Sequence, residues 1–156
     1  MRTRDPARRR VGAWIVGAKG DIAATVMVGA RALAKRVVSD TGLTTNLPPL
    51  DRLGLVGPGD IVFGGTDVSG APLRAAAQAL NTRSRTVSAT TLDAVADDLA
   101  SIEQDIVCCP QHSWDPSAVT EDLPPLSELV DQTRGHIRAF RERNGLDRVV
   151  VVNLMS

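Results

Sequence analysis

Two glycines at the junction between an apolar run and a helical pattern are the residues whose spacing points most clearly to chemistry. The apolar run Val11–Val16 is short and rich in strand-forming residues, and Gly17 and Gly20 follow it. Glycines at such a junction allow a tight turn. They also let a pyrophosphate approach free backbone N–H groups at the positive end of a helix dipole. The pattern Gly-x-x-Gly-x-x-Ala, which ends at Ala23, is not the full fingerprint Gly-x-Gly-x-x-Gly. It favours a dinucleotide-binding turn, with tight strand-to-helix packing and no ligand as the alternative.

Two charged residues lie inside the same junction. Lys19 opposes the positive end of the helix dipole, at a cost of about 0.3–1 kcal/mol at an exposed site, and a neighbouring phosphate would offset this cost. Asp21 suits the dipole, but its carboxylate would repel a pyrophosphate. We therefore expect Asp21 to begin the helix, and a contact with a cofactor through its backbone alone is one of two open alternatives.

Cysteine and histidine are too sparse to favour a metal centre. The only cysteines are the adjacent Cys108 and Cys109, and the only histidines are His112 and His136, whereas a structural zinc site needs four ligands. A Cys–His nucleophilic pair has no orienting third group that the sequence can locate. We interpret the cysteines as small buried hydrophobic residues, and we assign no catalytic residue.

The elements that must position the glycines alternate between strands and helices. Ile22, Val26, Leu33 and Val37 recur at helical spacing, and a loop rich in Pro and Gly follows over residues 39–59. We expect a strand at 60–65, then a helix at 71–80 with Ser69 as a candidate cap and Pro72 in its first turn, and a helix at about 92–102 capped by Thr90 or Thr91. A short strand or a frayed helix end follows at 105–109, and a loop at 110–125. The last elements expected are a helix from 126 that Gly145 terminates and a strand at 148–154 that is buried on both faces.

This order predicts an α/β fold: a Rossmann-like, doubly wound, mostly parallel sheet. The chain of 156 residues is long enough for one domain, which we place at 11–156 after a basic leader at 1–10. The sequence ends at Ser156, directly after its most hydrophobic strand, where an open sheet would continue into a loop and a covering helix. We therefore expect it to be the truncated N-terminal portion of a longer protein.

Composition excludes several classes of protein. Formal charge cancels to zero, and no stretch approaches the roughly 20 apolar residues that cross a bilayer, so we expect a cytoplasmic protein without a membrane partner. The leader concentrates positive charge at Arg2, Arg4, Arg8, Arg9 and Arg10. A solvated leader explains these arginines better than a nucleic-acid-binding arm, because aromatic residues are few. A charged face at Asp93, Asp97, Asp98 and Glu103 is interpreted as solvated.

Four segments together resemble a known family. They are Val-Gly-Ala-Trp-Ile-Val-Gly-Ala-Lys-Gly-Asp-Ile-Ala-Ala-Thr from Val11, Thr-Gly-Leu-Thr-Thr-Asn-Leu-Pro from Thr41, Asp-Ile-Val-Phe-Gly-Gly-Thr-Asp-Val from Asp60, and Gly-Leu-Asp-Arg-Val-Val-Val-Val-Asn from Gly145. In this order they resemble the N-terminal part of bacterial and archaeal inositol-3-phosphate synthases. That resemblance implies tightly held NAD, and glucose 6-phosphate as the substrate of the full-length enzyme. The sugar is oxidised at C5, closed by an aldol-type step and reduced again to inositol phosphate. It also implies a homo-oligomer acting in inositol and phospholipid biosynthesis.

The resemblance assigns cofactor contacts by position. Gly17, Lys19, Gly20, Asp21 and Ile22 match the family's pyrophosphate loop, although the loop departs from the Gly-Gly-Asn-Asn-Gly form of eukaryotic members. Asp67 matches an aspartate that accepts the adenosine ribose hydroxyls, and its charge would repel the 2′-phosphate of NADP. An Asx-turn or a helix-start role is the alternative for Asp67. The family's catalytic lysines belong to a domain that follows the dinucleotide fold, so none is assigned here.

Two other functions stay open on these grounds. One is a different NAD-linked oxidoreductase that shares only the fold. The other is a non-catalytic nucleotide-binding or subunit-association module.

Overall fold

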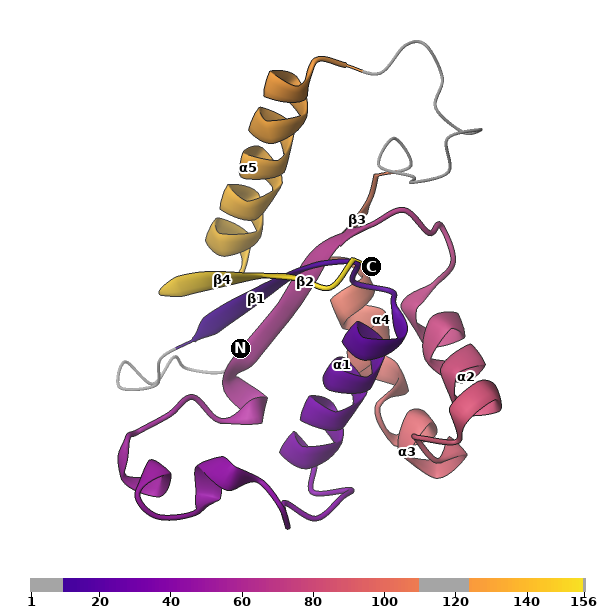
Figure 1. Ribbon diagram of the computed structural model, residues 1–156, viewed down its shortest axis with the longest axis vertical. Coiled ribbons are helices and arrows are strands. Elements are labelled where there is room, and N and C mark those ends of the chain that lie inside the picture. The colour runs from indigo at the N-terminus through magenta and orange to yellow at the C-terminus, as the bar shows by residue number, and fades with distance from the viewer. Residues whose placement is uncertain (1–9, 110–123, 156) are drawn as a thin grey trace.

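A parallel sheet with helices on both faces forms the centre of the molecule. The computed structural model describes residues 10–109 and 124–155. Its four strands are β1 (Val11–Val16), β2 (Ile61–Asp67), β3 (Ile106–Cys108) and β4 (Arg148–Asn153), in the order β3-β2-β1-β4. All three pairings are parallel. The predicted Rossmann-like, doubly wound α/β fold is therefore confirmed, with β1 in the middle of the sheet (Figure 1).

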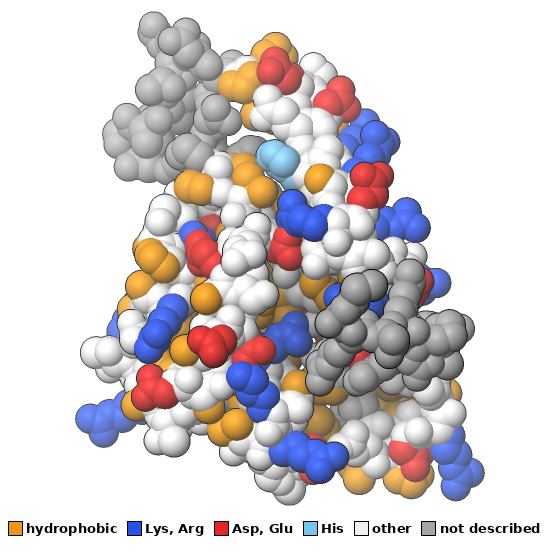
Figure 2. Space-filling view, turned by 180° about the vertical axis from the view of Figure 1, so that it is seen from behind, with side chains coloured by type: hydrophobic (Ala, Val, Ile, Leu, Met, Phe, Trp, Pro, Cys, Tyr) orange, Lys and Arg blue, Asp and Glu red, His pale blue; other side chains and the backbone are white. Residues whose placement is uncertain are grey.

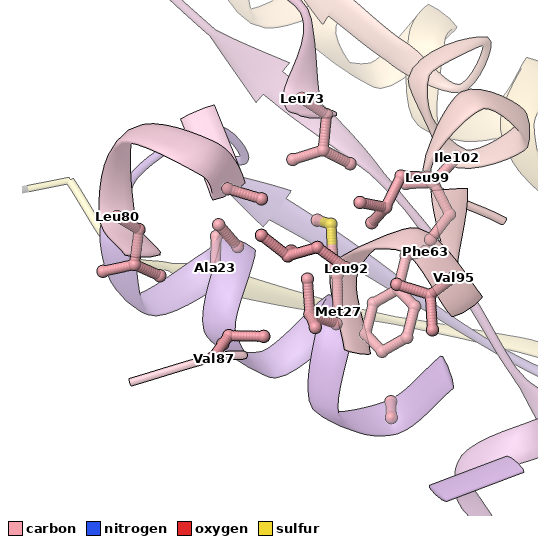
Figure 3. Close-up of a cluster of buried hydrophobic side chains, with 14 of the residues drawn as sticks. Ala23, Met27, Phe63, Leu73, Leu80, Val87, Leu92, Val95, Leu99 and Ile102 are labelled. Atoms are coloured by element: carbon pink, nitrogen blue, oxygen red, sulfur yellow. The ribbon is translucent and has the colours of Figure 1, made fainter. Parts of the chain in front are cut away.

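One face of the sheet is covered by the helices α1 (Asp21–Ala34), α2 (Leu73–Ser84), α3 (Ala89–Ala94) and α4 (Ala96–Glu103). Their buried side chains pack with Ile15 of β1 and Phe63 of β2 in one cluster. Figure 3 shows Met27 of α1 within this cluster, close to Leu92 of α3. The cluster holds α1 against the sheet, and it thereby fixes the end of the helix that faces the carboxyl ends of the strands.

The opposite face is covered by α5 (Leu126–Arg143), which crosses from β3 back to β4. Phe140 is fully buried there and makes an edge-on contact with Trp14, their ring centroids 5.4 Å apart. A Cβ atom at Gly12 or Gly64 would lie 2.8 Å or 2.7 Å from the Phe140 ring, so glycines in the two central strands make room for it. Gly145, with φ 57°, follows the Asn144 C-cap and ends the helix as predicted.

The prediction of which residues form the apolar face of α1 is wrong. Ile22 is 63% exposed and Val26 47% exposed, whereas the buried face consists of Ala23, Ala24, Met27, Val28, Ala30 and Ala32. Four of these six residues are alanines, whose small side chains let the helix lie close to the sheet, while Ile22 and Val26 face solvent. Val37, also assigned to the stripe, lies beyond the end of α1 and is exposed.

The boundaries of the next helices also differ from the prediction. The expected helix at 92–102 is two helices separated at Val95, and Ser88 caps α3 by accepting a hydrogen bond from the Thr91 N–H at 3.1 Å, in place of Thr90 or Thr91. Ser69 does not cap α2, because its hydroxyl accepts from Ala71 at 3.2 Å, and Pro72 occupies the N-cap position. The segment 39–59 includes two short 3₁₀ turns, Thr44–Asn46 and Leu50–Arg52, and a third, Pro58–Asp60, leads from it into β2. The short strand expected at 105–109 is confirmed as β3.

β4 is not buried on both faces. It is one of the two edge strands of the sheet in the described residues, and Val150, Val151 and Val152 are 48%, 53% and 38% exposed. Residues 1–9 of the predicted leader, and residues 110–123 with His112, lie outside the described residues. Arg10 is anchored, since its N–H donates to the Asp147 carboxylate at 3.0 Å.

The surface shows no segregation of charge on the face seen in Figure 2, where Lys and Arg side chains alternate with Asp and Glu over the described part of the chain. No helix in the described ranges is both long enough and apolar enough to cross a membrane.

Candidate dinucleotide-binding site

The turn between β1 and α1 is tied to the end of β2. The N–H groups of Gly17 and Ala18 both donate to the Thr66 carbonyl, at 2.9 and 3.1 Å. Gly17 has φ 84°, a left-handed conformation that glycine adopts without strain, and a Cβ there would lie 3.2 Å from Met155. The turn therefore requires glycine at position 17 for reasons of backbone geometry alone.

The first turn of α1 is left open. Gly20 is its N-cap residue and supplies no side-chain cap, and the first helical hydrogen bond runs from the Ala24 N–H to the Gly20 carbonyl at 2.9 Å. The N–H groups of Asp21, Ile22 and Ala23 precede this bond, so none has an acceptor inside the helix. Together with the helix dipole, these groups form a site suited to an anion.

Gly20, unlike Gly17, is not required by the backbone conformation of the turn. Its φ of −68° is ordinary for any residue, and a Cβ built there would meet only the Gly17 carbonyl oxygen, at 3.3 Å. Glycine at position 20 is therefore only weakly required by the fold. Its small size keeps the space in front of the helix N-terminus open, as the approach of a dinucleotide requires.

Asp67 is buried at the carboxyl end of β2, and both of its carboxylate oxygens accept backbone hydrogen bonds. Oδ2 accepts from the Lys19 N–H at 2.6 Å and Oδ1 from the Ser69 N–H at 2.8 Å. The second contact is the Asx-turn expected as the alternative role. The first joins the glycine loop to β2 and brings Asp67 beside the loop, although Lys19 and Asp67 are 48 positions apart in the sequence.

Lys19 is buried and directed away from solvent. Its ammonium lies 2.8 Å from Oε1 of Glu103, the last residue of α4, and only 4% of the Lys19 side chain is exposed. The carboxylate, rather than a phosphate, offsets the unfavourable position of this charge near the helix N-terminus. The interpretation of Glu103 as part of a solvated face is wrong.

Asp21 begins α1, as expected, and its carboxylate forms an ion pair with Arg83 of α2 on the surface. The carboxylate is therefore held by α2, while the backbone N–H of Asp21 belongs to the first turn of α1. Ile22 contributes its N–H to the same turn, and its side chain is exposed.

A small pocket of about 100 Å³ lies beside Asp67 at the carboxyl edge of the sheet. It is lined by Val16, Thr66, Asp67, Val68, Cys109, Thr133 and Met155. The cysteines are not buried hydrophobic residues: Cys108 is exposed and Cys109 partly exposed. Burial of its sulfur, with a smaller contribution from Cys108, raises the pKa of the Cys109 thiol.

The sequence did not predict the contacts of Glu103 and Arg83 or the place of Cys109 in the pocket. Cys109 directly follows a strand and could have been placed at the ligand-binding edge by the rule that parallel strands present their carboxyl ends there. Glu103 and Arg83 gave no local signal, because their partners are brought to them by helix packing. Within the described ranges, no group of three or more His, Cys, Asp or Glu side chains is arranged to hold a metal ion.

The sheet order, the glycine turn after β1, the uncapped helix and the acidic residue at the end of β2 define a Rossmann-like dinucleotide-binding domain. Comparison with known proteins gives the family. A family model of an NAD-binding domain, described as Myo-inositol-1-phosphate synthase, matches residues 11–156. The chain belongs to the myo-inositol-1-phosphate synthase family and is the NAD-binding portion, so its cofactor is NAD.

Two relatives show how much of a family member's length this chain covers. Inositol-3-phosphate synthase 1 of Bacteroides thetaiotaomicron is 29% identical over 161 residues, a match that covers 94% of this chain and 36% of the relative. The crystal structure of inositol-3-phosphate synthase from Caenorhabditis elegans superposes with a TM-score of 0.68 at 18% identity, covering 96% of this chain and 35% of that one. The chain therefore spans about a third of the length of either relative.

Proposed function

We propose that the pyrophosphate of NAD binds at the N-terminus of α1. Backbone N–H groups of Asp21 and Ile22 serve as donors there, while Gly17, Lys19 and Gly20 shape the loop around it. The observation that carries the proposal is the open first turn of α1 behind Gly20, which presents N–H groups without helical acceptors. The Lys19 ammonium is already paired with Glu103, so its contribution is made through the loop backbone.

Asp67 is proposed to bind the adenosine ribose. Each carboxylate oxygen can accept more than one hydrogen bond, so the contacts from Lys19 and Ser69 leave acceptor capacity for ribose hydroxyls. The pocket beside it, with Val68 and Cys109 in its lining, offers an apolar wall to the adenine end of the cofactor.

The wider reaction is proposed from the family. In this proposal, residues 11–156 form the NAD-binding domain of a longer inositol-3-phosphate synthase, which is cytoplasmic, assembles as a homo-oligomer and uses glucose 6-phosphate. Bound NAD would accept a hydride from C5 of the sugar and return a hydride after ring closure. The part of the site assigned here holds and orients the cofactor, and the substrate-binding and proton-transferring groups are proposed to lie in the remaining two thirds that the relatives possess.

Substitution of Gly20 tests the proposed pyrophosphate site. A valine at position 20 places methyl groups in the space before the helix N-terminus, so Gly20→Val should raise the Kd for NAD by more than about tenfold, a loss of about 1.4 kcal/mol. Gly20→Ala should have a much smaller effect, since its Cβ meets only the Gly17 carbonyl.

Gly29→Val is the matched control, because Gly29 lies on the same helix and a Cβ there has no neighbour within 4 Å. Titration calorimetry gives the Kd, and circular dichroism checks that the helices are retained. Unchanged NAD affinity in a folded Gly20→Val protein would refute the site.

The same proposal predicts no synthase activity for the isolated chain of 156 residues. Hydride transfer requires the sugar carbon to be held close to the nicotinamide, and ring closure needs groups that move protons and stabilise an enolate. Purified chain incubated with NAD and glucose 6-phosphate should form inositol phosphate only at the background rate. Formation above background would place the substrate site within this portion and contradict the proposed division of roles.

A further inference from the structure

Glu103 makes two contacts at the base of the glycine loop. Its Oε1 lies 2.8 Å from the Lys19 ammonium, and its Oε2 accepts a hydrogen bond from the Leu73 N–H at 2.5 Å. Leu73 is the first residue of α2, so this carboxylate also serves as the acceptor that Pro72, at the N-cap position, does not provide. One side chain at the end of α4 thus joins the loop to a second helix.

Lys19 is consequently held at both its ends. Its backbone N–H donates to Asp67, and its ammonium pairs with Glu103. The two carboxylates come from different elements, β2 and α4, and the aliphatic part of the Lys19 side chain lies between these anchors with almost no exposure to solvent. Lys19 immediately precedes Gly20, so its placement sets where the uncapped turn of α1 begins.

We propose that Glu103 is a positioning residue for NAD. It retains the Lys19 ammonium beneath the loop, so that the pyrophosphate meets the backbone N–H groups of α1 in one prearranged geometry. This inference rests on the proposed pyrophosphate site. The physical reason is that Lys19 is the buried member of the ion pair, with 4% of its side chain exposed against 33% for Glu103, so removal of the Glu103 charge leaves a buried charge uncompensated. Without the Glu103 charge, Lys19 must leave its buried position to be solvated, and the loop must move with it.

A double-mutant cycle separates this role from simple stabilisation. Glu103→Gln keeps an oxygen that can accept from Leu73 but loses the charge, and it should raise the Kd for NAD about tenfold. Lys19→Met removes the ammonium and keeps the apolar stem. In a Lys19→Met background, the further change Glu103→Gln should alter the Kd by less than about twofold, because no buried charge is then left unpaired.

Asp98→Asn is the matched control. Asp98 of α4 pairs with Lys35 at the other end of α1, at 2.5 Å, so it joins the same two helices away from the glycine loop. This variant should lower the melting temperature without changing the Kd for NAD. Melting temperatures are measured for every variant, and the Kd is measured where each is folded.

Three results would overturn the proposal. The first is an unchanged Kd in folded Glu103→Gln, and the second is equal effects of Glu103→Gln with and without Lys19. The third is tighter NAD binding by Glu103→Gln with a steeper dependence on salt, which would mean that Glu103 withholds Lys19 from the phosphates. Gly20→Val distinguishes a failure of the pyrophosphate site from a failure of the positioning role of Glu103. If it weakens NAD binding while Glu103→Gln leaves the Kd unchanged, only the role of Glu103 fails. If Gly20→Val binds NAD normally, the pyrophosphate site fails as well.

Discussion

The Asp67 carboxylate accepts a hydrogen bond from the Lys19 N–H at 2.6 Å, and this bond connects the end of β2 to the glycine loop that follows β1. Asp67 therefore has a structural role before any ligand binds. The same carboxylate is the group proposed to receive the ribose hydroxyls, so loop placement and cofactor selection depend on one side chain.

Replacement of Asp67 should narrow the preference for NAD over NADP. The carboxylate repels a 2′-phosphate, so the unmutated chain should bind NAD more tightly than NADP. Asp67→Asn removes the charge while its amide oxygen can still accept from Lys19. It should reduce the ratio of the two Kd values, and Asp67→Ala should reduce it too with a larger loss of thermal stability. The Kd values come from calorimetry with each nucleotide, and equal affinities of the unmutated protein for both would contradict the ribose assignment.

The sequence was sufficient to predict the parallel sheet and the meeting of the glycine turn with the end of β2, because both depend on local patterns. A short apolar run before Gly17 and a second run before Asp67 predict two parallel strands whose carboxyl ends meet, and the structure pairs Val16 with Thr66. The rotation of α1 could not be predicted in the same way. Ile22 and Val26 have helical spacing, but close packing favours the alanine face, and this choice depends on the distance between helix and sheet.

The partners of the site residues could not be predicted from the sequence, for a different reason. Lys19 and Glu103 are joined only because α4 ends against the loop, and the order of α3, α4 and β3 brings it there. The Asp21–Arg83 pair similarly requires the neighbouring placement of α1 and α2. Spacing along the chain carries information on one element at a time, whereas these pairs report how the helices pack.

Cys109 should react slowly with alkylating reagents, and NAD should slow it further. Burial raises the pKa of its thiol, so at neutral pH a smaller fraction is thiolate than for an ordinary cysteine, and the rate should keep rising with pH above the usual thiol pKa. In a Cys108→Ser variant, mass spectrometry can follow Cys109 alone. Because Cys109 lines the pocket beside Asp67, saturating NAD should reduce its alkylation rate. An identical rate with and without NAD would show that the cofactor does not cover this pocket.

The exposed valines of β4 should promote self-association of the isolated chain. Val150 and Val152 pair in register with Ala13 and Ile15, on the sheet face that carries α1. An apolar edge strand can pair with another copy of the chain. Lysine at both positions should shift sedimentation profiles toward monomer. Val149→Lys, on the opposite face against Phe140 and Leu146, should instead destabilise the fold. Unchanged association in the double-lysine variant would exclude this surface as the cause.

A crystal structure of the chain with NAD tests the central claim most directly. We expect pyrophosphate oxygens within about 2.7–3.2 Å of the backbone nitrogens of Asp21 and Ile22, a hydrogen-bond distance. We also expect the Lys19 ammonium to remain beside Glu103. A pyrophosphate bound elsewhere, or held by a Lys19 side chain that has left Glu103, would contradict the account.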